Sequence, residues 1–323
     1  MKKNYITHKT GNKTFKQEIN LNGNDRQIDL SETWGSHFGH RNEIGKLKSV
    51  LLKKPGKEIE GEVMENPEKW HWRGKMDPKL AREQHSSLVE AYLNNGVQVN
   101  FVEHNDERLP CSVFVTDTFF MTPEGAILAK PGLETRKGEE IYVRRKLAEM
   151  DVPIVGMVHG TGKFEGATAM WVDPETVIIG TSTRTNEIGK IQVKEILSHM
   201  GVKNFLEQQI PYNSIHIDGI ISIVDKKKAL VDPNCLPYYI WKELKIRGFD
   251  ILEQEWSEEK KNLSINTVAL EPGKVLMPAG NPKTRNLLQK NGIETIEIDV
   301  SELLKGGGGI HCMTGLIKRE PIN

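Results

Sequence analysis

The chain is poor in the features that mark several common classes of protein. Its 323 residues include only three cysteines, Cys111, Cys235 and Cys312, with no Cys-x-x-Cys pair, which argues against both a disulfide framework and a zinc site. Lysine plus arginine and aspartate plus glutamate both number 44, so the formal net charge is zero. No excess of positive charge therefore marks a nucleic-acid-binding surface. No apolar run is long enough for a transmembrane helix.

The N-terminal sequence also lacks an apolar core. Met1-Lys2-Lys3-Asn4-Tyr5 leads into polar residues, so we expect no signal peptide and a cytoplasmic protein. Residues 1–40 contain few apolar residues, and we predict that they form a polar N-terminal extension. Residues 41–323 are enough to bury a large core, and we predict that they form a single domain.

What the chain does contain is a repeat at the ends of its helices. Five times, an amphipathic stretch ends at Gly or Asp and continues as a short apolar stretch, at Asn95-Gly96-Val97, Met150-Asp151-Val152, Met200-Gly201-Val202, Arg247-Gly248-Phe249 and Asn291-Gly292-Ile293. Gly or Asp at such a turn suits a helix end in the left-handed region. The turns are 55, 50, 47 and 44 residues apart.

Each interval contains two strand-like stretches, a helical stretch and the strand after the turn. Residues 113–121 and 126–129, for example, precede a helix over residues 139–150. A doubly wound sheet needs about one strand per helix, whereas here there are about three, so five similar units favour a ring with five-fold pseudosymmetry. A coincidence of loop lengths is the alternative. We expect the final segment, residues 310–318, to close the ring against residues 47–53.

Three of the predicted strands are interrupted by ionisable residues. Asp117 interrupts the apolar stretch 114–120, Glu165 precedes small residues in the stretch 164–170, and His216 and Asp218 lie two apart in the stretch 215–221. Residues two apart in a strand point to the same side. An acid in an apolar strand costs desolvation energy unless it is paired, so these residues are candidates for a shared site near the axis of the ring.

The fourth element of this candidate site is a thiol behind a run of glycines. Gly306 to Gly309 lead directly into Ile310-His311-Cys312 and the strand-like Met313-Thr314-Gly315-Leu316-Ile317. Glycine accepts close approaches that a Cβ would block, so the run predicts a bend that presents Cys312 at a crowded site. Carboxylates, a histidine and a thiol together suit a planar cation, because a guanidinium carries five N–H donors in a fixed fork.

These segments resemble the guanidino-group-modifying enzyme superfamily, which includes arginine deiminases, dimethylarginine hydrolases and amidinotransferases. The matching segments occur in the expected order from about residue 45 to 320: Leu51-Leu52-Lys53-Lys54-Pro55-Gly56, Ser112-Val113-Phe114-Val115-Thr116-Asp117, Phe164-Glu165-Gly166, Ser182-Thr183-Arg184-Thr185-Asn186, His216-Ile217-Asp218 and Gly307-Gly308-Gly309-Ile310-His311-Cys312. The resemblance implies the pentein fold, a five-bladed α/β propeller, in agreement with the repeat.

The resemblance also implies roles for the matched residues. Cys312 would be the nucleophile, His216 the general acid and base, and Glu165 the residue that orients His216. Asp117 and Asp218 would hold the guanidinium nitrogens. Two arginines, Arg184 and the looser match Arg136, are candidates for binding the α-carboxylate of the substrate, and a solvated surface position is the alternative for both.

One position departs from the family pattern. Many members read Glu-Gly-Gly-Asp where this chain reads Glu165-Gly166-Ala167-Thr168, so the charge of the second acid is missing. Two other features have two interpretations. Cys111 is either part of the pocket or a buried structural thiol, and the aromatic-basic segment Trp70-His71-Trp72-Arg73 is either a lid or a surface patch.

The sequence thus predicts a hydrolase that acts on the guanidino group of arginine or a related guanidino acid through a covalent intermediate on Cys312. The alternatives are an amidinotransferase that passes the amidino group to an acceptor amine, and a non-catalytic pentein binding module. We expect a small-molecule guanidino substrate as the partner, no nucleic-acid or membrane partner, and no metal or organic cofactor. Formation of a homo-oligomer is left open.

Overall fold

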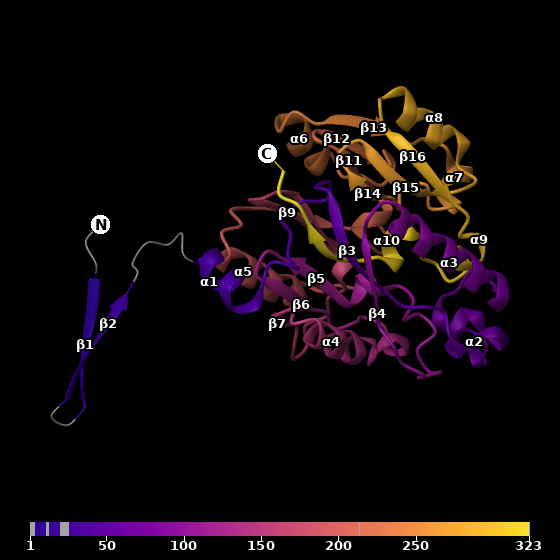
Figure 1. Ribbon diagram of the computed structural model, residues 1–323. Helices are drawn as coiled ribbons and strands as arrows, with labels where there is room; N and C mark the ends of the chain where they lie inside the picture. The colour runs from indigo at the N-terminus through magenta and orange to yellow at the C-terminus, as the bar shows by residue number, and fades with distance from the viewer. Residues whose placement is uncertain (1–3, 11–12, 20–25, 213, 323) are drawn as a thin grey trace. The chain divides into compact units, whose positions relative to one another are not determined.

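The computed structural model describes residues 4–10, 13–19, 26–212 and 214–322, which divide into two compact units, residues 1–36 and 37–323. The first unit contains the antiparallel hairpin of β1 (Asn4–Thr10) and β2 (Lys13–Ile19) and the helix α1 (Arg26–Trp34) (Figure 1). The second unit contains every residue named above as a candidate for the site. It begins at His37, and the predicted domain boundary at residue 40 stays a prediction.

The described part of the unit 37–323 contains five similar three-stranded sheets, each with one long helix between its second and third strands; the first sheet also has the short helix α2 (Glu62–Glu65) there. In every sheet the inner strand pairs antiparallel with the middle strand, and the middle strand pairs parallel with the outer one. Given as inner strand, middle strand, helix and outer strand, the units are β17 (Gly315–Arg319), β3 (Leu47–Leu52), α3 (Pro78–Asn94) and β4 (Gln98–Phe101); β5 (Phe119–Thr122), β6 (Gly125–Leu128), α4 (Glu139–Glu149) and β7 (Ile154–Met157); β8 (Ala169–Asp173), β9 (Thr176–Thr181), α5 (Glu187–His199) and β10 (Asn204–Gln209); β11 (Ile221–Asp225), β12 (Lys228–Val231), α6 (Tyr238–Ile246) and β13 (Asp250–Glu253); β14 (Val268–Glu271), β15 (Lys274–Pro278), α8 (Pro282–Lys290) and β16 (Glu294–Ile298).

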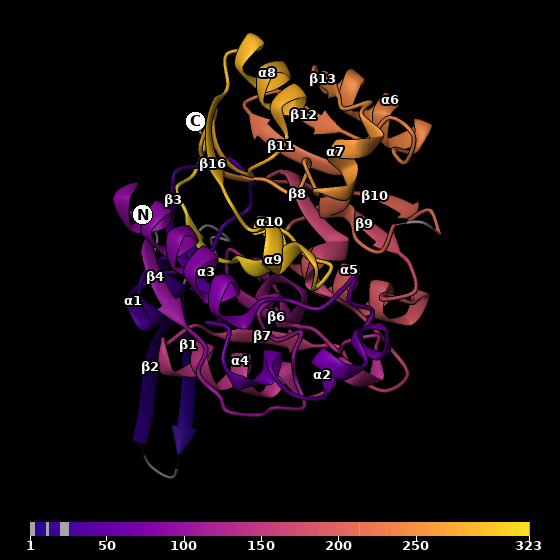
Figure 2. The ribbon, with the colours of Figure 1, turned by 90° about the vertical axis from the view of Figure 1, so that its right-hand side faces the viewer.

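This arrangement confirms the predicted five-bladed α/β propeller. The last strand of the chain, β17, supplies the inner strand of the first unit and pairs with β3, as the sequence predicts. In the view of Figure 2, the five long helices lie around the periphery of this unit and the short helices α9 (Ser301–Leu304) and α10 (Ile310–Met313) lie near its middle. No helix in the described part of the chain is both long and apolar enough to cross a bilayer.

The five turns after the helices adopt the predicted left-handed conformation. Their φ angles are 71° at Gly96, 52° at Asp151, 90° at Gly201, 78° at Gly248 and 78° at Gly292. Glycine adopts this region without the steric penalty of a Cβ, and aspartate tolerates it better than most residues. Each turn reverses the chain so that the outer strand can pair beside the middle strand of its own unit.

Each helix is fixed to its sheet by a pair of buried residues four positions apart. Residues i and i+4 lie on the same helix face, so one such pair places a continuous stripe against the core. In order, the pairs are Leu88 and Tyr92, Val143 and Leu147, Val193 and Leu197, Ile240 and Leu244, and Thr284 and Leu288.

The structure corrects the predicted form of the interrupted strands. Asp117 lies in a 3₁₀ turn, Val115–Thr118, and strand β5 begins only at Phe119. Asp218 likewise lies in the 3₁₀ turn Ile217–Gly219, so the expectation that it shares one strand face with His216 is wrong. A turn satisfies the local backbone groups while it directs a polar side chain out of the sheet, which a continuous apolar strand cannot do.

The segment around the thiol also differs from the prediction. Residues 310–313 form the short helix α10, and strand β17 starts at Gly315, where the sequence predicts a strand from Met313. The helix places Cys312 one turn ahead of the closing strand.

Candidate active site

The candidate residues occupy equivalent positions in the five units. Each stands in the turn before an inner strand: Asp117 before β5, Glu165 before β8, His216 and Asp218 before β11, Asn266 before β14 and Cys312 before β17. Five of these residues, Asp117, His216, Asp218, Asn266 and Cys312, line one cavity of about 640 Å³. The pseudosymmetry therefore brings together side chains that are far apart in the sequence.

The glycine run allows the close packing around Cys312. A Cβ on Gly308 would lie 2.4 Å from Cδ1 of Phe114, and one on Gly309 would lie 2.6 Å from Oδ1 of Asn266. That same Oδ1 accepts hydrogen bonds from the backbone N–H of His311 at 2.9 Å and of Cys312 at 3.2 Å. Asn266 therefore fixes the turn that carries the thiol.

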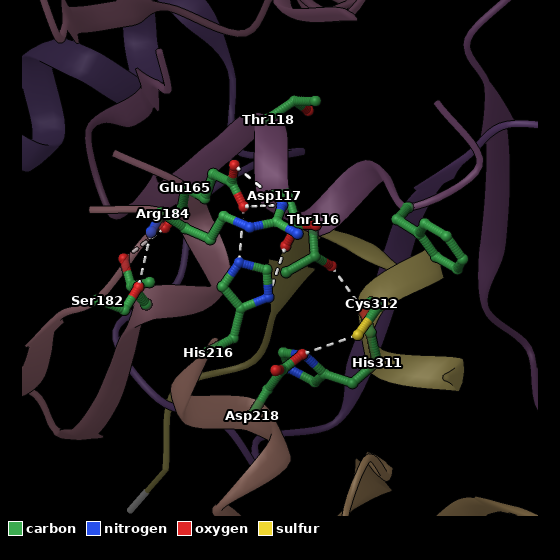
Figure 3. Close-up of polar contacts among 12 residues, drawn as sticks. Thr116, Asp117, Thr118, Glu165, Ser182, Arg184, His216, Asp218, His311 and Cys312 are labelled. Carbon is green, nitrogen blue, oxygen red and sulfur yellow. Dashed lines mark hydrogen bonds and ion pairs between the residues drawn. The ribbon is translucent and has the colours of Figure 1, made fainter. Parts of the chain in front are cut away.

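The thiol itself lies against a carboxylate. Sγ of Cys312 is 3.3 Å from Oδ2 of Asp218 and 3.3 Å from Nδ2 of Asn266, and the residue is buried (Figure 3). Burial and the charges of Asp218 and Asp117 raise the pKa of Cys312 well above that of an ordinary thiol. Without a cation in the cavity, Cys312 is a neutral thiol at neutral pH.

His216 is held by two acids from two other units. Its Nε2 lies 2.7 Å from Oε2 of Glu165, and its Nδ1 lies 3.5 Å from Oδ1 of Asp117. Burial opposes the charge of His216, but Asp117 and Glu165 outweigh it and raise the pKa of the imidazole. Glu165 is fully buried, yet the hydrogen bond from His216 and the charges of Arg136, His216 and Arg184 lower its pKa to about 2. Both shifts favour the pair of an imidazolium and a carboxylate.

In the described part of the chain, Asp117 has one oxygen that takes part in no hydrogen bond and faces the ring of His216. Its Oδ2 accepts a hydrogen bond from Arg136, whereas its buried Oδ1 has no hydrogen-bond partner among the described residues. An unpaired buried acceptor is costly. It is positioned to accept an N–H from a ligand in the cavity.

The two candidate arginines have different surroundings. Arg136 is 3% exposed, and besides Asp117 it donates to Glu139 at 2.6 Å and to the carbonyl oxygen of Phe114 at 3.1 Å. Its donors hold Asp117 in place. Both arginines line the cavity, and Arg184 directs Nη1 to Glu165 at 3.3 Å. The predicted contact of either arginine with a substrate carboxylate stays a prediction.

Thr168, the residue that departs from the family pattern, makes hydrogen bonds with the protein around it. Thr168 is fully buried, and its hydroxyl donates to the carbonyl oxygen of Glu165 at 2.6 Å and lies 2.7 Å from Oγ1 of Thr185. Oγ1 of Thr185 in turn accepts the backbone N–H of Glu165 at 3.1 Å. Hydroxyl groups thus fix the backbone of Glu165 without a second acid.

Cys111 and the aromatic-basic segment of residues 70–73 both contribute to the cavity wall. Trp70 and Trp72 are buried, and Nε1 of Trp72 donates to Sγ of Cys111 at 3.3 Å. Trp70, Arg73 and Cys111 line the cavity, so the aromatic segment is part of the wall and not an isolated surface patch. Cys111 is a buried thiol whose pKa burial raises to about 11.

Sequence reasoning missed four residues of the site. Asn266 and His311 contact the groups around the thiol, and Asp232 and Lys260 form an ion pair in the cavity wall. A signal for Asn266 exists, because Ser264-Ile265-Asn266-Thr267 stands in the fifth unit where His216-Ile217-Asp218-Gly219 stands in the fourth. No local pattern marks Lys260, which lies in α7 (Ser257–Lys261) between two units.

One group of side chains has the composition of a metal site. Asp117, Glu165 and His216 offer donor atoms that lie within 4.8 Å of one another. Arg136 pairs with both carboxylates, Arg184 pairs with Glu165, and His216 already bonds to Glu165. A network of buried ion pairs therefore accounts for this group, and the expectation of a metal-free site stays a prediction.

Comparisons with known proteins show the family to which the chain belongs. The family model described as eukaryotic N,N-dimethylarginine dimethylhydrolase matches residues 65–319. The N(G),N(G)-dimethylarginine dimethylaminohydrolase of Pseudomonas aeruginosa is 29% identical over 248 residues, which cover 75% of this chain and 90% of that protein. A crystal structure of the Pseudomonas aeruginosa enzyme, a cysteine-to-serine mutant complexed with citrulline, has a TM-score of 0.69 at 26% identity and covers 84% of this chain and 100% of its own.

Two more distant proteins match over similar lengths. The arginine deiminase of Streptococcus agalactiae is 22% identical over 404 residues, which cover 87% of this chain and 97% of that protein. The amidinotransferase SxtG of Microseira wollei has a TM-score of 0.71 at 17% identity, covering 88% of this chain and 98% of its own, a likeness of fold alone.

The family match spans most of the chain, and the predicted superfamily is confirmed. The chain belongs to the N,N-dimethylarginine dimethylhydrolase family, within a superfamily of guanidino-modifying enzymes that includes hydrolases of C–N bonds in linear amidines.

Proposed function

We propose that this protein hydrolyses the guanidino group of arginine, of an N-methylated arginine or of a closely related guanidino amino acid through a covalent intermediate on Cys312. One observation carries the proposal: the thiol of Cys312 stands in a cavity that two acids, Asp218 and Asp117, also line, and the hydrogen-bonded pair of His216 and Glu165 lies in the same site. The relatives named for dimethylarginine and arginine support this class of substrate.

Binding of the substrate activates the nucleophile. The free Oδ1 of Asp117 and the carboxylate of Asp218 accept N–H groups of the planar guanidinium. The positive charge of the guanidinium offsets the two negative charges that hold Cys312 in its neutral form, so the thiol releases its proton to solvent. The resulting thiolate lies beside the guanidino carbon, and fixed geometry lowers the barrier to attack.

His216 then transfers protons in both halves of the reaction. Sγ of Cys312 bonds to the guanidino carbon, and the C–N bond to the leaving amine breaks as His216 gives that nitrogen its proton. A water molecule next adds to the same carbon and gives one proton to His216. The S–C bond then breaks, and Cys312 leaves as a thiolate that takes up the second proton of the water. The product carries a urea group, and His216 is again protonated. Glu165 keeps the imidazole oriented throughout.

The cavity also offers both charges that an amino-acid head group needs. Arg184 and Asp232 follow the middle strands of adjacent units, β9 and β12, and both line the cavity. Arg184 supplies a cation for the α-carboxylate, and the buried Asp232 supplies an anion for the α-ammonium group. Lys260 keeps Asp232 ionised, because their ion pair helps to lower the pKa of Asp232 against the effect of burial.

Amidino transfer is the second candidate function. The first half-reaction would be the same, and an acceptor amine would replace water in the second. A cavity of about 640 Å³ lies within the range that holds drug-sized ligands, so it has room for an acceptor. A non-catalytic binding module is less favoured now that Thr168, the feature that suggested it, has a structural role.

Mass spectrometry of the protein quenched during turnover tests the proposal. We expect arginine or an N-methylated arginine, supplied alone, to release ammonia or a methylated amine and to add the mass of the remaining substrate to the peptide that contains Cys312. The Cys312→Ser variant should fold and form no such adduct. An adduct that persists without a released urea-type product until an amine is added would establish transfer instead. No adduct with any guanidino compound would refute both enzyme functions.

A further inference from the structure

Two histidine–carboxylate pairs lie near Cys312, and only one of the two histidines takes part in the proton transfers proposed above. The first pair is His216 with Glu165. The second is His311, the residue before the nucleophile, whose Nδ1 lies 2.9 Å from Oδ2 of Asp218. Figure 3 shows His311 and Asp218 together below the sulfur, away from the contact of His216 with Glu165. His311 is largely buried and does not line the main cavity.

A single oxygen atom joins His311 to the thiol. Oδ2 of Asp218 accepts from Nδ1 of His311 and from Nδ2 of Asn266 at 3.0 Å, and it lies 3.3 Å from Sγ of Cys312. A change in the charge of His311 therefore changes the electrostatic potential at Oδ2 of Asp218. The negative charge on that oxygen opposes formation of the Cys312 thiolate. Asn266 shares this oxygen but carries no charge.

The groups around the His311 ring favour its charged form. Burial opposes the charge, but the hydrogen bond and the charge of Asp218, with a smaller contribution from Glu43, raise the pKa of His311, and Arg319 acts in the opposite direction. His40 faces the same region and is a neutral histidine, because burial and Arg319 lower its pKa to about 3. Between these residues lies a second cavity of about 30 Å³.

The ring of His311 has one fixed contact. Its Nε2 is buried with no hydrogen-bond partner among the described residues, and so is Nε2 of His40. The bond to Asp218 is thus the interaction that sets the orientation of His311, and the same bond sets the orientation of Asp218 toward the sulfur.

We infer that His311 is a positioning residue for Cys312: its imidazolium, bonded through Nδ1 to Asp218, holds that carboxylate against the thiol and offsets the negative charge that opposes the thiolate. The inference rests on the proposed role of Cys312 as nucleophile. It assigns the two histidines separate tasks, since His216 moves protons on the substrate and His311 acts on the nucleophile through Asp218. Removal of the charge on His311 would leave the charge of Asp218 uncompensated and make the thiolate harder to form.

The test compares His311→Asn with wild type. Asparagine keeps a donor near the position of Nδ1 but carries no charge. The rate of alkylation of Cys312 by iodoacetamide, followed peptide by peptide so that Cys111 and Cys235 are resolved, gives the pH midpoint of the thiol. We expect the midpoint of His311→Asn to lie about one pH unit higher, which lowers the rate about tenfold at a fixed pH below the midpoint. The acidic limb of kcat/KM should also move to higher pH, because Asp218 loses the cation that keeps it ionised.

The matched control is His40→Asn, which removes a buried but neutral ring from the other wall of the small cavity and should leave the midpoint unchanged. His311→Gln serves in the same assay if His311→Asn does not fold, as judged by thermal unfolding. An unchanged midpoint in a folded His311 variant, or an equal shift in His40→Asn, overturns the inference. A separate experiment tests the proposed function itself: wild type is treated with 2-chloroacetamidine, a cation shaped like the guanidinium group. If the proposed function is wrong, this reagent will label Cys312 no faster than Cys111 or Cys235.

Discussion

At the scale of the residue, the site separates groups that face the substrate from groups that hold them. Cys312, His216 and Asp218 line the cavity, whereas Glu165 is fully buried behind His216. Burial of an ion is costly unless it is paired, and Glu165 is paired with both His216 and Arg184. Substitution of the buried acid therefore tests how far the reaction depends on the charge state of His216.

We predict that Glu165→Gln slows the reaction and shifts its pH dependence. The amide keeps the shape of the side chain but removes one of the charges that raise the pKa of His216. The basic limb of kcat/KM should move to lower pH, and kcat should fall about 10²- to 10⁴-fold, the usual contribution of a general acid. Steady-state kinetics across pH measures both changes, with the exposed Glu134→Gln as the control. A lower kcat with an unmoved basic limb would show that Glu165 only supports the local structure.

Arg184→Gln is predicted to distinguish substrates by their head groups. Loss of a charged hydrogen bond to the α-carboxylate should raise KM for arginine or an N-methylated arginine about 10- to 100-fold. A guanidino amine without a carboxylate, such as agmatine, makes no such contact, so its KM should change far less. Comparison of KM and kcat for both compounds provides the measurement. An equal loss for both would mean that Arg184 acts only through Glu165.

At the scale of the element, the sequence predicts those features of helices and strands that depend on the residues of one short segment. Turn residues such as Gly96 and Asp151 mark the helix ends, because the left-handed region is open to few residue types. The form of the segment around Asp117 is not predicted, since an apolar stretch with one acid fits a strand as well as a 3₁₀ turn followed by a strand. The position of Lys260 depends on how two units pack together, which no local pattern contains.

The turn before Cys312 offers two neighbouring glycines with different constraints. A Cβ on Gly308 would clash with the ring of Phe114 and lie 3.0 Å from Cβ of Cys312, whereas Gly307 has φ of +93° and its nearest neighbour is 3.7 Å away. We predict that Gly308→Ala displaces the nucleophile and lowers kcat at least about tenfold, as small misplacements of reacting groups do.

The matched variant Gly307→Ala should instead cost about 1–2 kcal/mol of stability, because a left-handed backbone is strained in alanine. Its effect on kcat should be the smaller one. Chemical denaturation and steady-state kinetics of both variants provide the measurements. The reverse order, with Gly307→Ala the less active and Gly308→Ala the less stable protein, would contradict this account of the glycine run.

At the scale of the whole molecule, the site exists only when all five units are assembled. The acids and His216 come from the second, third and fourth units, Asn266 from the fifth, and Cys312 from the segment that pairs with the first. The five-fold repeat could be predicted from the spacing of the helix ends. The pairing of particular side chains across units, such as Asn266 with Cys312, could not, because it depends on packing between segments distant in sequence. The cytoplasmic location, the absence of a nucleic-acid partner and the oligomeric state stay predictions.

The stability of the assembled unit is predicted to fall in mild acid because of two buried neutral histidines. Burial lowers the pKa of both His40 and His85 from 6.5 to about 3, with nearby Arg319 acting on the first and Lys53 and Lys54 on the second. The unfolded chain binds protons at these sites as the pH falls below about 6.5, whereas the folded chain does not until about pH 3. Stability present above pH 6.5 is therefore lost progressively between these two values.

The contribution of one histidine can be isolated by His85→Gln. Between pH 7 and pH 5.5, each such histidine should cost about 1 kcal/mol of the free energy of unfolding, so the variant should lose about that much less than wild type over the same interval. Denaturant unfolding at the two pH values gives the difference, and the exposed His159→Gln should behave like wild type. The comparison between variants cancels the opposite trend from His216 and His311, whose raised pKa values favour the folded state as the pH falls. Equal losses in wild type and His85→Gln would mean that His85 is protonated in the folded protein or accessible to solvent through local opening.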